Sequence, residues 1–233
     1  MAHRINILAQ RSGRIGNTNT AMPGTSFATD AFACGVDSKL AKIAGSVCDK
    51  CYARRLQSYR TNLQVGWTRN LRVALERIAT DPEGWAQDMA AQINAYASLS
   101  QEPYHRWFDS GDLASAAMLG AIVRVCELSP TVHHWLPTRE LALVRAYIRA
   151  GGSIPANLVI RASAPMIDDA PLKGWTHTST VHSKRELGAA EYRCPKLDKG
   201  RGNKCDGTGE GTDHPPCRAC WNRNVPTVSY KKH

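Results

Sequence analysis

The sequence lacks the two features that would direct it to a membrane. No apolar stretch approaches the roughly 20 residues that a membrane-spanning helix requires. The segment from Met1 to Gln10 contains no long apolar run and no small-residue cleavage site, which are the marks of an export signal. We therefore expect a cytoplasmic protein with no membrane partner, in a compartment where thiols stay reduced.

Several common catalytic motifs are also missing. The chain has no Walker loop, no Gly-x-Gly-x-x-Gly fingerprint, no His-Glu-x-x-His helix and no Ser/His/Asp order. The chemistry of hydrolases and of nucleotide-fold dehydrogenases therefore has no residue from which to start.

Acidic residues are scarce relative to basic ones. The chain has 20 Asp and Glu against 30 Lys and Arg, which gives a net charge of +10 and a pI near 9.4. This balance fits three situations: a nucleic-acid partner, an anionic small molecule, or a basic surface with no specific partner.

Apolar periodicity in the middle of the chain alternates between helix and strand. Spacings of three and four predict helices over 69–79, 82–96, 114–128 and 141–148. Apolar and aromatic runs predict strands over 104–108, 131–136, 158–162 and 178–181. This alternation predicts an α/β fold with a parallel sheet, for which we favour a partial (β/α) barrel over an open doubly wound layer.

Beyond Arg193 the periodicity is lost and the sequence is rich in Gly, Lys, Asp and Cys. Such a segment buries too little apolar surface to order itself, so bound metal is its expected source of order. We predict a barrel-like unit over residues 1–193 with an N-terminal cysteine loop. A cysteine-rich, metal-ordered tail over 194–233 would pack on it as part of one structural unit.

Seven of the eight cysteines fall into two groups, which we name the trio and the tail quartet. The trio is Cys34, Cys48 and Cys51, and the tail quartet is Cys194, Cys205, Cys217 and Cys220. Each group contains a Cys-x2-Cys step, which places two thiols on one tight turn where both sulfurs reach a single metal ion or cluster. Disulfides are the alternative, but a chain of this length buries a core without them.

The tail quartet supplies enough ligands for a second, closed site of zinc or iron–sulfur, or some of its members complete the first site. We favour an arrangement that brings some tail cysteines close to the trio. The remaining cysteine, Cys126, lies on the apolar face of the predicted helix over 114–128 and is expected in the core.

Polar residues follow the ends of two predicted strands: the turn Asp109-Ser110-Gly111-Asp112, and Arg161. Parallel strands gather their carboxyl ends on one side, so we expect Asp112 and Arg161 to face the pocket of the trio. There Asp112 would accept the ammonium of an amino-acid-like ligand and Arg161 would clamp its carboxylate. The alternatives are a plain helix N-cap for the turn and a local ion pair for Arg161.

Two further pairs of residues have simple structural interpretations. Arg139 and Glu140 stand at a predicted helix start, where they are expected to form surface ion pairs at most. His133 and His134 are neighbours on a strand and point to opposite faces, so they cannot hold one metal together.

Four motifs resemble a phage family named after mycobacteriophage gene product eighty-eight. They are Pro23-Gly24-Thr25-Ser26-Phe27, Cys48-Asp49-Lys50-Cys51-Tyr52-Ala53-Arg54, Asp109-Ser110-Gly111-Asp112-Leu113 and Cys217-Arg218-Ala219-Cys220-Trp221. The resemblance covers most of the chain, and its most specific parts are the two Cys-x2-Cys motifs. It implies a phage or prophage origin and an iron–sulfur protein.

The chain also resembles, more distantly, radical S-adenosylmethionine enzymes. In that resemblance the trio would hold a [4Fe–4S] cluster with one open iron, and Ser110, Gly111 and Asp112 would stand where those enzymes bind the amino group of S-adenosylmethionine. The cysteine spacing is wider than in those enzymes, and Tyr52 follows the last cysteine where they have an aromatic residue before it.

Two classes of function follow from these observations. In the first class, the protein is an enzyme that uses an open cluster iron, with S-adenosylmethionine or a small carboxylate as ligand. Alternatively, the metal cluster is structural and the basic surface binds nucleic acid through its phosphates.

Overall fold

The structure is a computed structural model that describes residues 2–17, 22–197, 205 and 216–232. Its framework is an eight-stranded sheet in the order β1-β2-β3-β4-β5-β6-β8-β7. The strands are β1 (Ile15–Asn17), β2 (Thr25–Phe27), β3 (Tyr104–Trp107), β4 (His133–Thr138), β5 (Leu158–Ile167), β6 (Thr178–His182), β7 (Glu191–Arg193) and β8 (Thr227–Lys231). The β1–β2 pair is antiparallel, and the other neighbouring pairs are parallel.

Helices fill most of the connections before β5. The α-helices are α1 (Ala2–Ser12), α2 (Gly35–Leu40), α3 (Tyr52–Tyr59), α4 (Thr61–Thr80), α5 (Pro82–Ser100), α6 (Ala116–Leu128) and α7 (Leu141–Arg149). Short 3-10 helices are η1 (Ala31–Ala33), η2 (Pro195–Leu197) and η3 (Ala219–Trp221). Among the described residues, none of these helices is both long enough and apolar enough to cross a membrane.

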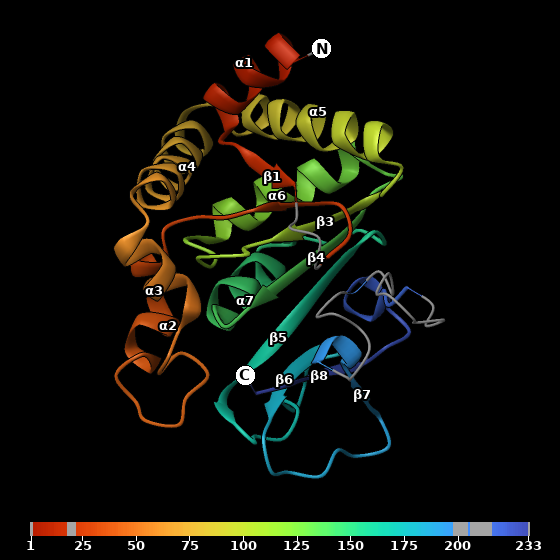
Figure 1. Ribbon diagram of the computed structural model, residues 1–233. Helices are drawn as coiled ribbons and strands as arrows, with labels where there is room; N and C mark the ends of the chain where they lie inside the picture. The colour runs from red at the N-terminus through yellow and green to blue at the C-terminus, as the bar shows by residue number, and fades with distance from the viewer. Residues whose placement is uncertain (1, 18–21, 198–204, 206–215, 233) are drawn as a thin grey trace, which may run out of the picture.

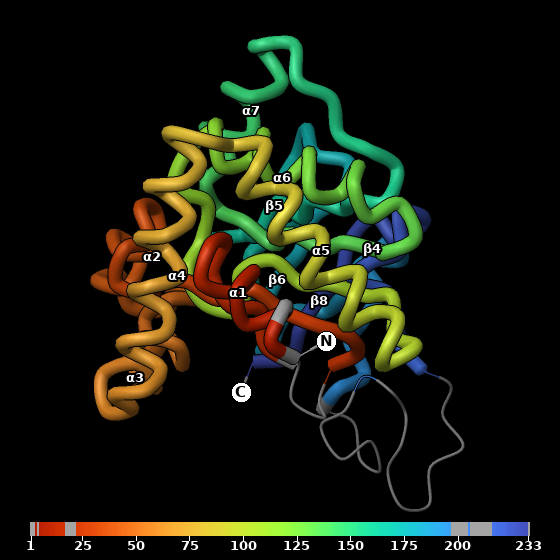
Figure 2. Tube along the Cα trace, turned by 90° about the horizontal axis from the view of Figure 1, so that it is seen from above, coloured from red at the N-terminus to blue at the C-terminus, as the bar shows by residue number. Residues whose placement is uncertain are grey.

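The helices that connect β2 to β5 lie on one face of the sheet. The strands β2 to β6 follow one another across the sheet in chain order and in parallel. Right-handed crossovers that always step in the same direction put their helices on the same side. Figure 1 shows α4 to α7 gathered there, and Figure 2 shows α1 beside α4 and α5. The main core lies between these helices and the sheet, around Trp85, Trp107 and Leu136.

The end of the chain covers the opposite face. There η3 packs on β4 and β5, and β8 enters the sheet between β6 and β7 (Figure 1). Trp221 of η3 contacts Trp135 and Tyr104 edge-on, with ring centroids 5.3 Å and 5.4 Å away. Alternation along each strand therefore decides whether a side chain meets the helices or the tail.

The prediction of a parallel α/β sheet is confirmed, but closure into a barrel is not. The described sheet has two edges, β1 and β7, and is open. A closed barrel would require its first and last strands to pair, whereas here β1 turns antiparallel and β7 pairs with β8. The predicted partial (β/α) barrel is therefore not confirmed, and the described sheet is open and mostly parallel.

The strongly periodic segments are confirmed as elements of the predicted type. The four predicted helices correspond to α4, α5, α6 and α7, and the four predicted strands to β3, β4, β5 and β6. Cys126 is fully buried in the main core, as predicted. The predicted metal-ordered tail over 194–233 falls partly on residues 198–204 and 206–215, which lie outside the described residues.

His133 and His134 point to opposite faces of β4, as predicted, since His133 is exposed and His134 is fully buried. The ring of His134 lies 5.6 Å from that of His105, which is also fully buried. Burial lowers the pKa of His105 well below its ordinary value, and burial together with His133 lowers that of His134 to about 3. Both imidazoles are therefore neutral in the folded protein at neutral pH.

We expect these two histidines to make the fold sensitive to acid. Between the ordinary pKa of 6.5 and a folded value of about 3, the unfolded chain binds a proton at His134 that the folded chain does not. The contribution of each buried histidine to the free energy of unfolding is therefore fully present above about pH 6.5. It falls as the pH drops below that value, by up to about 1.4 kcal/mol per pH unit for each histidine. Urea unfolding from about pH 7 to about pH 5 measures this slope. His134→Gln should flatten it, and an unchanged slope would contradict the assignment.

Candidate metal centre

The trio is assembled by two helix starts and the turn between them. Cys34 is the N-cap residue of α2 and Cys51 that of α3, and neither caps its helix with its side chain. Cys34 and Cys48 are buried, and Cys51 is half-buried. No disulfide joins any cysteine of the described chain. The cysteines therefore stand as free thiols around the ends of two short helices.

The three thiols lie close enough to perturb one another electrostatically. Burial raises the pKa of Cys34 most, and Asp37, Asp112, Cys51 and Cys48 raise it further. The pKa of Cys48 rises to about 12, chiefly through burial and against the opposing effect of Arg139. The trio, separated by up to 17 positions in sequence (34 to 51), is thus one cluster in space.

The turn that carries Cys48 is fastened to the carboxyl end of β5. Val47 donates its backbone N–H to Pro165, and Ile167 donates to Gly45, with distances of 3.0 Å and 3.1 Å. The Ser46 hydroxyl donates to Leu40 at 2.7 Å. This pairing places the cysteines at the carboxyl edge of the sheet, where the connecting loops were expected to form a site.

Residues directly after β4 hold α2 and its cysteine in place. Glu140 accepts a hydrogen bond of 2.6 Å from the backbone of Val36, so its carboxylate caps the first turn of α2. Arg139 forms an ion pair of 3.0 Å with Asp37 of the same helix. Glu140 is buried and the Arg139–Asp37 pair is largely so, which corrects the expectation of surface ion pairs at most.

The turn after β3 brings Asp112 to the trio. Its carboxylate accepts hydrogen bonds from the Thr138 hydroxyl at 2.6 Å, and from the backbone of Leu113 at 2.7 Å and of Arg139 at 2.9 Å. Burial raises the pKa of Asp112 to about 7, and these hydrogen bonds oppose that rise. Asp112 is among the groups that raise the pKa of Cys34, so the two side chains lie within electrostatic range of each other, and a role of Asp112 toward a ligand stays a prediction.

Ser110 and Gly111 shape the same turn. Gly111 has a φ of 82°, and a side chain at this position would collide with Thr29. The backbone oxygen of Ser110 accepts a hydrogen bond of 2.9 Å from the backbone of Thr29. The Ser110 hydroxyl is buried and has no hydrogen-bond partner among the described residues. The conformation of the turn therefore depends on Gly111, and the Ser110 hydroxyl can still form a hydrogen bond with a ligand.

The described tail cysteines form a second group. Burial raises the pKa of Cys205 to about 11 with further contributions from Cys194 and Cys217, and that of Cys220 to about 12 with contributions from Cys194 and Cys205. The backbone N–H of Cys217 donates to Cys205 at 2.7 Å. The four thiols of the quartet are therefore neighbours in space.

The two groups lie apart. The thiols that perturb Cys34 and Cys48 belong to the trio, and those that perturb Cys205 and Cys220 belong to the quartet. In Figures 1 and 2, α2 and α3 lie on one side of the molecule and η3 on the other. This arrangement does not support our preference for tail cysteines close to the trio.

Arg161 belongs to the tail and not to the pocket of the trio. It is fully buried, and its three nitrogens donate to the backbone oxygens of Thr178, Ala219, Cys220, Asn222, Val225 and Pro226, at 2.8 to 3.3 Å. The expected role as a carboxylate clamp beside Asp112 is therefore corrected. Arg161 lies on the tail-facing side of β5, where it holds the segment that carries Cys220.

Arg106 of β3 lies between the two groups and was not recognised from the sequence. It forms an ion pair of 2.7 Å with Asp109, which also accepts a hydrogen bond of 2.6 Å from the Tyr52 hydroxyl at its backbone oxygen. Its guanidinium stacks 4.8 Å from the Trp135 ring, and it lies within electrostatic range of Cys220. Alternation on β3 was the available signal, since it puts Arg106 on the face opposite Trp107.

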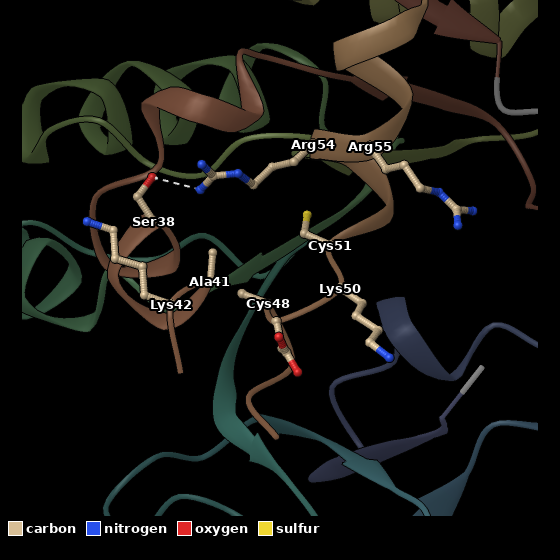
Figure 3. A pocket seen from close by; sticks show the side chains of 9 residues that line it. Ser38, Ala41, Lys42, Cys48, Lys50, Cys51, Arg54 and Arg55 are labelled. Carbon is tan, nitrogen blue, oxygen red and sulfur yellow. Dashed lines mark hydrogen bonds between the residues drawn. The ribbon is translucent and has the colours of Figure 1, made fainter. Parts of the chain in front are cut away.

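A cavity of about 480 Å³ opens beside the trio. Its lining residues are Ser38, Ala41, Lys42, Cys48, Asp49, Lys50, Cys51, Arg54 and Arg55 (Figure 3). Within the described residues, no three His, Cys, Asp or Glu side chains are arranged as a ready-made site for a metal ion. The residue types of the trio, three soft thiols, suit iron–sulfur or zinc, but their arrangement here is not that of a formed metal site.

Comparison with known proteins identifies one family. The family model described as Gene product 88 matches residues 16–223, which include the trio and the tail quartet. This match confirms the resemblance to a phage gene-product family. No curated protein and no solved structure matches the chain.

Proposed function

We propose that this chain, which belongs to the Gene product 88 family, is an iron–sulfur protein of the host-cell cytoplasm that carries a [4Fe–4S] cluster on Cys34, Cys48 and Cys51. The observation that supports this most is the gathering of the three thiols beside two carboxylates in a largely buried place. The tail quartet would hold a second centre of zinc or iron–sulfur.

The electrostatics of the trio favour a bound cation. Burial, neighbouring thiols, Asp37 and Asp112 all oppose ionisation of Cys34 in the protein alone. A thiol must lose its proton to become a ligand, and a bound metal centre reverses the sign of these unfavourable interactions. Glu140 and the Arg139–Asp37 ion pair then keep the ligand-bearing helix in position whether or not the thiols are ionised.

Three protein ligands suggest a centre with chemistry of its own. When bound, a [4Fe–4S] cluster with three cysteine ligands supplies one iron that can take an atom of a substrate or of S-adenosylmethionine. Ser110, with its unpartnered hydroxyl, lies in the turn that also carries Asp112. We propose that this turn positions the ligand of the open iron, with Ser110 as hydrogen-bonding group and Asp112 holding the turn.

The test is metal analysis of protein purified without oxygen. We expect brown protein with iron and acid-labile sulfide, and a Cys48→Ser/Cys51→Ser variant that has lost the iron of the trio. Cys126→Ala is the matched control, because Cys126 lies in the main core and should leave iron content unchanged. Colourless wild-type protein with stoichiometric zinc and no iron would refute the proposal. A change in the electron paramagnetic resonance spectrum of the reduced protein on addition of S-adenosylmethionine would support the enzyme.

Nucleic-acid binding is a second candidate, favoured by the net charge of +10. In that case the metal centres would be structural and phosphates would bind the basic surface. Affinity for a DNA duplex should then fall steeply with salt, by roughly one power of the salt concentration per phosphate contacted. Equal affinity of the iron-loaded protein and the Cys48→Ser/Cys51→Ser variant would favour this candidate.

A further inference from the structure

The cavity beside the trio has a strong excess of positive charge. Four cationic side chains line it, Lys42, Lys50, Arg54 and Arg55, against one carboxylate, Asp49, so the lining carries a net charge of +3 (4 − 1). Like charges on one cavity repel, and an anionic ligand would relieve this repulsion. The charge of the lining therefore indicates an anionic ligand.

The part of the chain that the structure describes does not supply an anion for these cations. Among the described residues, no carboxylate forms an ion pair with the side chains of Lys42, Lys50, Arg54 or Arg55. Asp49 accepts a hydrogen bond of 3.3 Å from the backbone of Gly45. The positive charge of the lining is therefore available to a ligand.

One of the four cations is held in a defined place. Arg54 donates to the Ser38 hydroxyl at 3.4 Å, and its guanidinium lies 4.7 Å from the centre of the Phe32 ring. Stacking on an aromatic ring fixes the plane of a guanidinium and leaves its edge free for an oxyanion. Arg54 is thus oriented before any ligand binds, which reduces the entropic cost of binding.

The cations divide into two sets around the cavity. Figure 3 shows Arg54, Ser38 and Lys42 on one side, while Lys50 and Arg55 extend toward the other. The sulfur of Cys51 lies between these sets. A guanidinium and an ammonium on one side form a suitable pair of donors for a phosphate or carboxylate. The Ser38 hydroxyl accepts from Arg54 and donates to the backbone oxygen of Phe32 at 3.2 Å, so it helps to position Arg54.

We propose that Arg54, positioned by Ser38, and Lys42 form a binding site for the oxyanion of a small-molecule ligand whose other end reaches Cys48 and Cys51. The inference rests on the proposed function, which puts an iron–sulfur cluster on Cys48 and Cys51. A cavity of about 480 Å³ fits a small molecule. Arg54 and Lys42 thereby take the part of anion clamp that the sequence had suggested for Arg161.

The test is calorimetric titration of the anaerobically purified protein with two probes, inorganic phosphate and succinate, at constant ionic strength. We expect saturable binding of at least one probe, weakened about tenfold or more in Lys42→Ala/Arg54→Ala, since two charge-assisted contacts are lost. Lys42→Arg keeps the charge and leaves the stacked guanidinium of Arg54 in place, so it should retain most of the affinity. Binding of phosphate alone identifies a phosphate-bearing ligand, and binding of succinate alone a carboxylate.

A charge-matched control separates local binding from net charge. Arg149 and Lys173 are exposed and lie outside the cavity, so Arg149→Ala/Lys173→Ala removes the same two charges and should leave binding unchanged. Equal affinity of Lys42→Ala/Arg54→Ala and wild type would overturn the inference. So would the absence of saturable binding, or binding of a DNA oligonucleotide by these residues when neither small anion binds.

Iron analysis of the same samples distinguishes the two proposals. Iron-loaded wild-type protein that binds neither probe overturns the anion site alone. Iron-free wild-type protein that binds a probe through Lys42 and Arg54 supports the anion site and refutes the proposed cluster.

Discussion

Arg161→Met should lower the free energy of unfolding by roughly 3–5 kcal/mol, because it leaves several buried acceptors without donors. The guanidinium donates to six backbone oxygens, five of which belong to the tail between residues 219 and 226. Methionine has similar length but no donor. Burial lowers the pKa of Arg161, and the backbone oxygens that accept its hydrogen bonds offset this loss of solvation.

Chemical denaturation followed by tryptophan fluorescence measures this effect, since Trp221 packs within the same segment. The control is Arg149→Met on the exposed side of α7, which should change stability by less than about 0.5 kcal/mol. If Arg161→Met unfolded at the same denaturant concentration as wild type, the tail would be held by other contacts and Arg161 would be dispensable.

The direction and the partners of the Arg161 side chain could not be predicted from the sequence. Its position at a strand was predictable, but the face to which it points depends on strand register, which flips with a shift of one residue. Its partners lie 58 to 65 positions further along the chain, with the exception of Thr178. They include the loop between η3 and β8, and nothing in local periodicity connects that loop with β5.

The middle of the fold was more predictable because its signals are local. The helices α5 and α6 carry long apolar stripes, and α5 begins at Pro82 with Asp81 as N-cap, accepting a hydrogen bond of 2.9 Å from the backbone of Gly84. By contrast, β1, β2 and β7 have three residues each, too few for a period to be recognised. Their pairing comes from tertiary contacts.

The cysteines of the candidate site could be picked out from the sequence, but the residues that hold them in place could not. The Cys-x2-Cys spacing identified two of the three members of the trio, since it constrains sulfurs through local geometry alone. Glu140 caps a helix that begins about 100 positions earlier in the chain, and Arg139 pairs with Asp37 across 102 positions. Such pairs become visible only when the carboxyl ends of β4 and the start of α2 are placed side by side.

Cys217→Ser/Cys220→Ser should remove the metal of the tail, leave the iron of the trio, and lower stability by several kcal/mol. The four thiols of the quartet are neighbours of one another and not of the trio, so the two centres should load independently. Metal analysis of this variant beside Cys48→Ser/Cys51→Ser gives the measurement, because each double variant should lose only the metal of its own group.

The expected loss of stability in Cys217→Ser/Cys220→Ser follows from the contacts between the tail and the sheet. Cys220 and Trp221 pack on the face of the sheet that carries Trp135, and the backbone oxygen of Cys220 accepts a hydrogen bond of 3.0 Å from Arg161. Metal bound by the quartet would therefore hold together residues that cover one side of the sheet. Unchanged metal content and an unchanged unfolding midpoint in Cys217→Ser/Cys220→Ser would refute a ligand role for these cysteines. Loss of iron from both groups in that variant would show one shared centre in place of two.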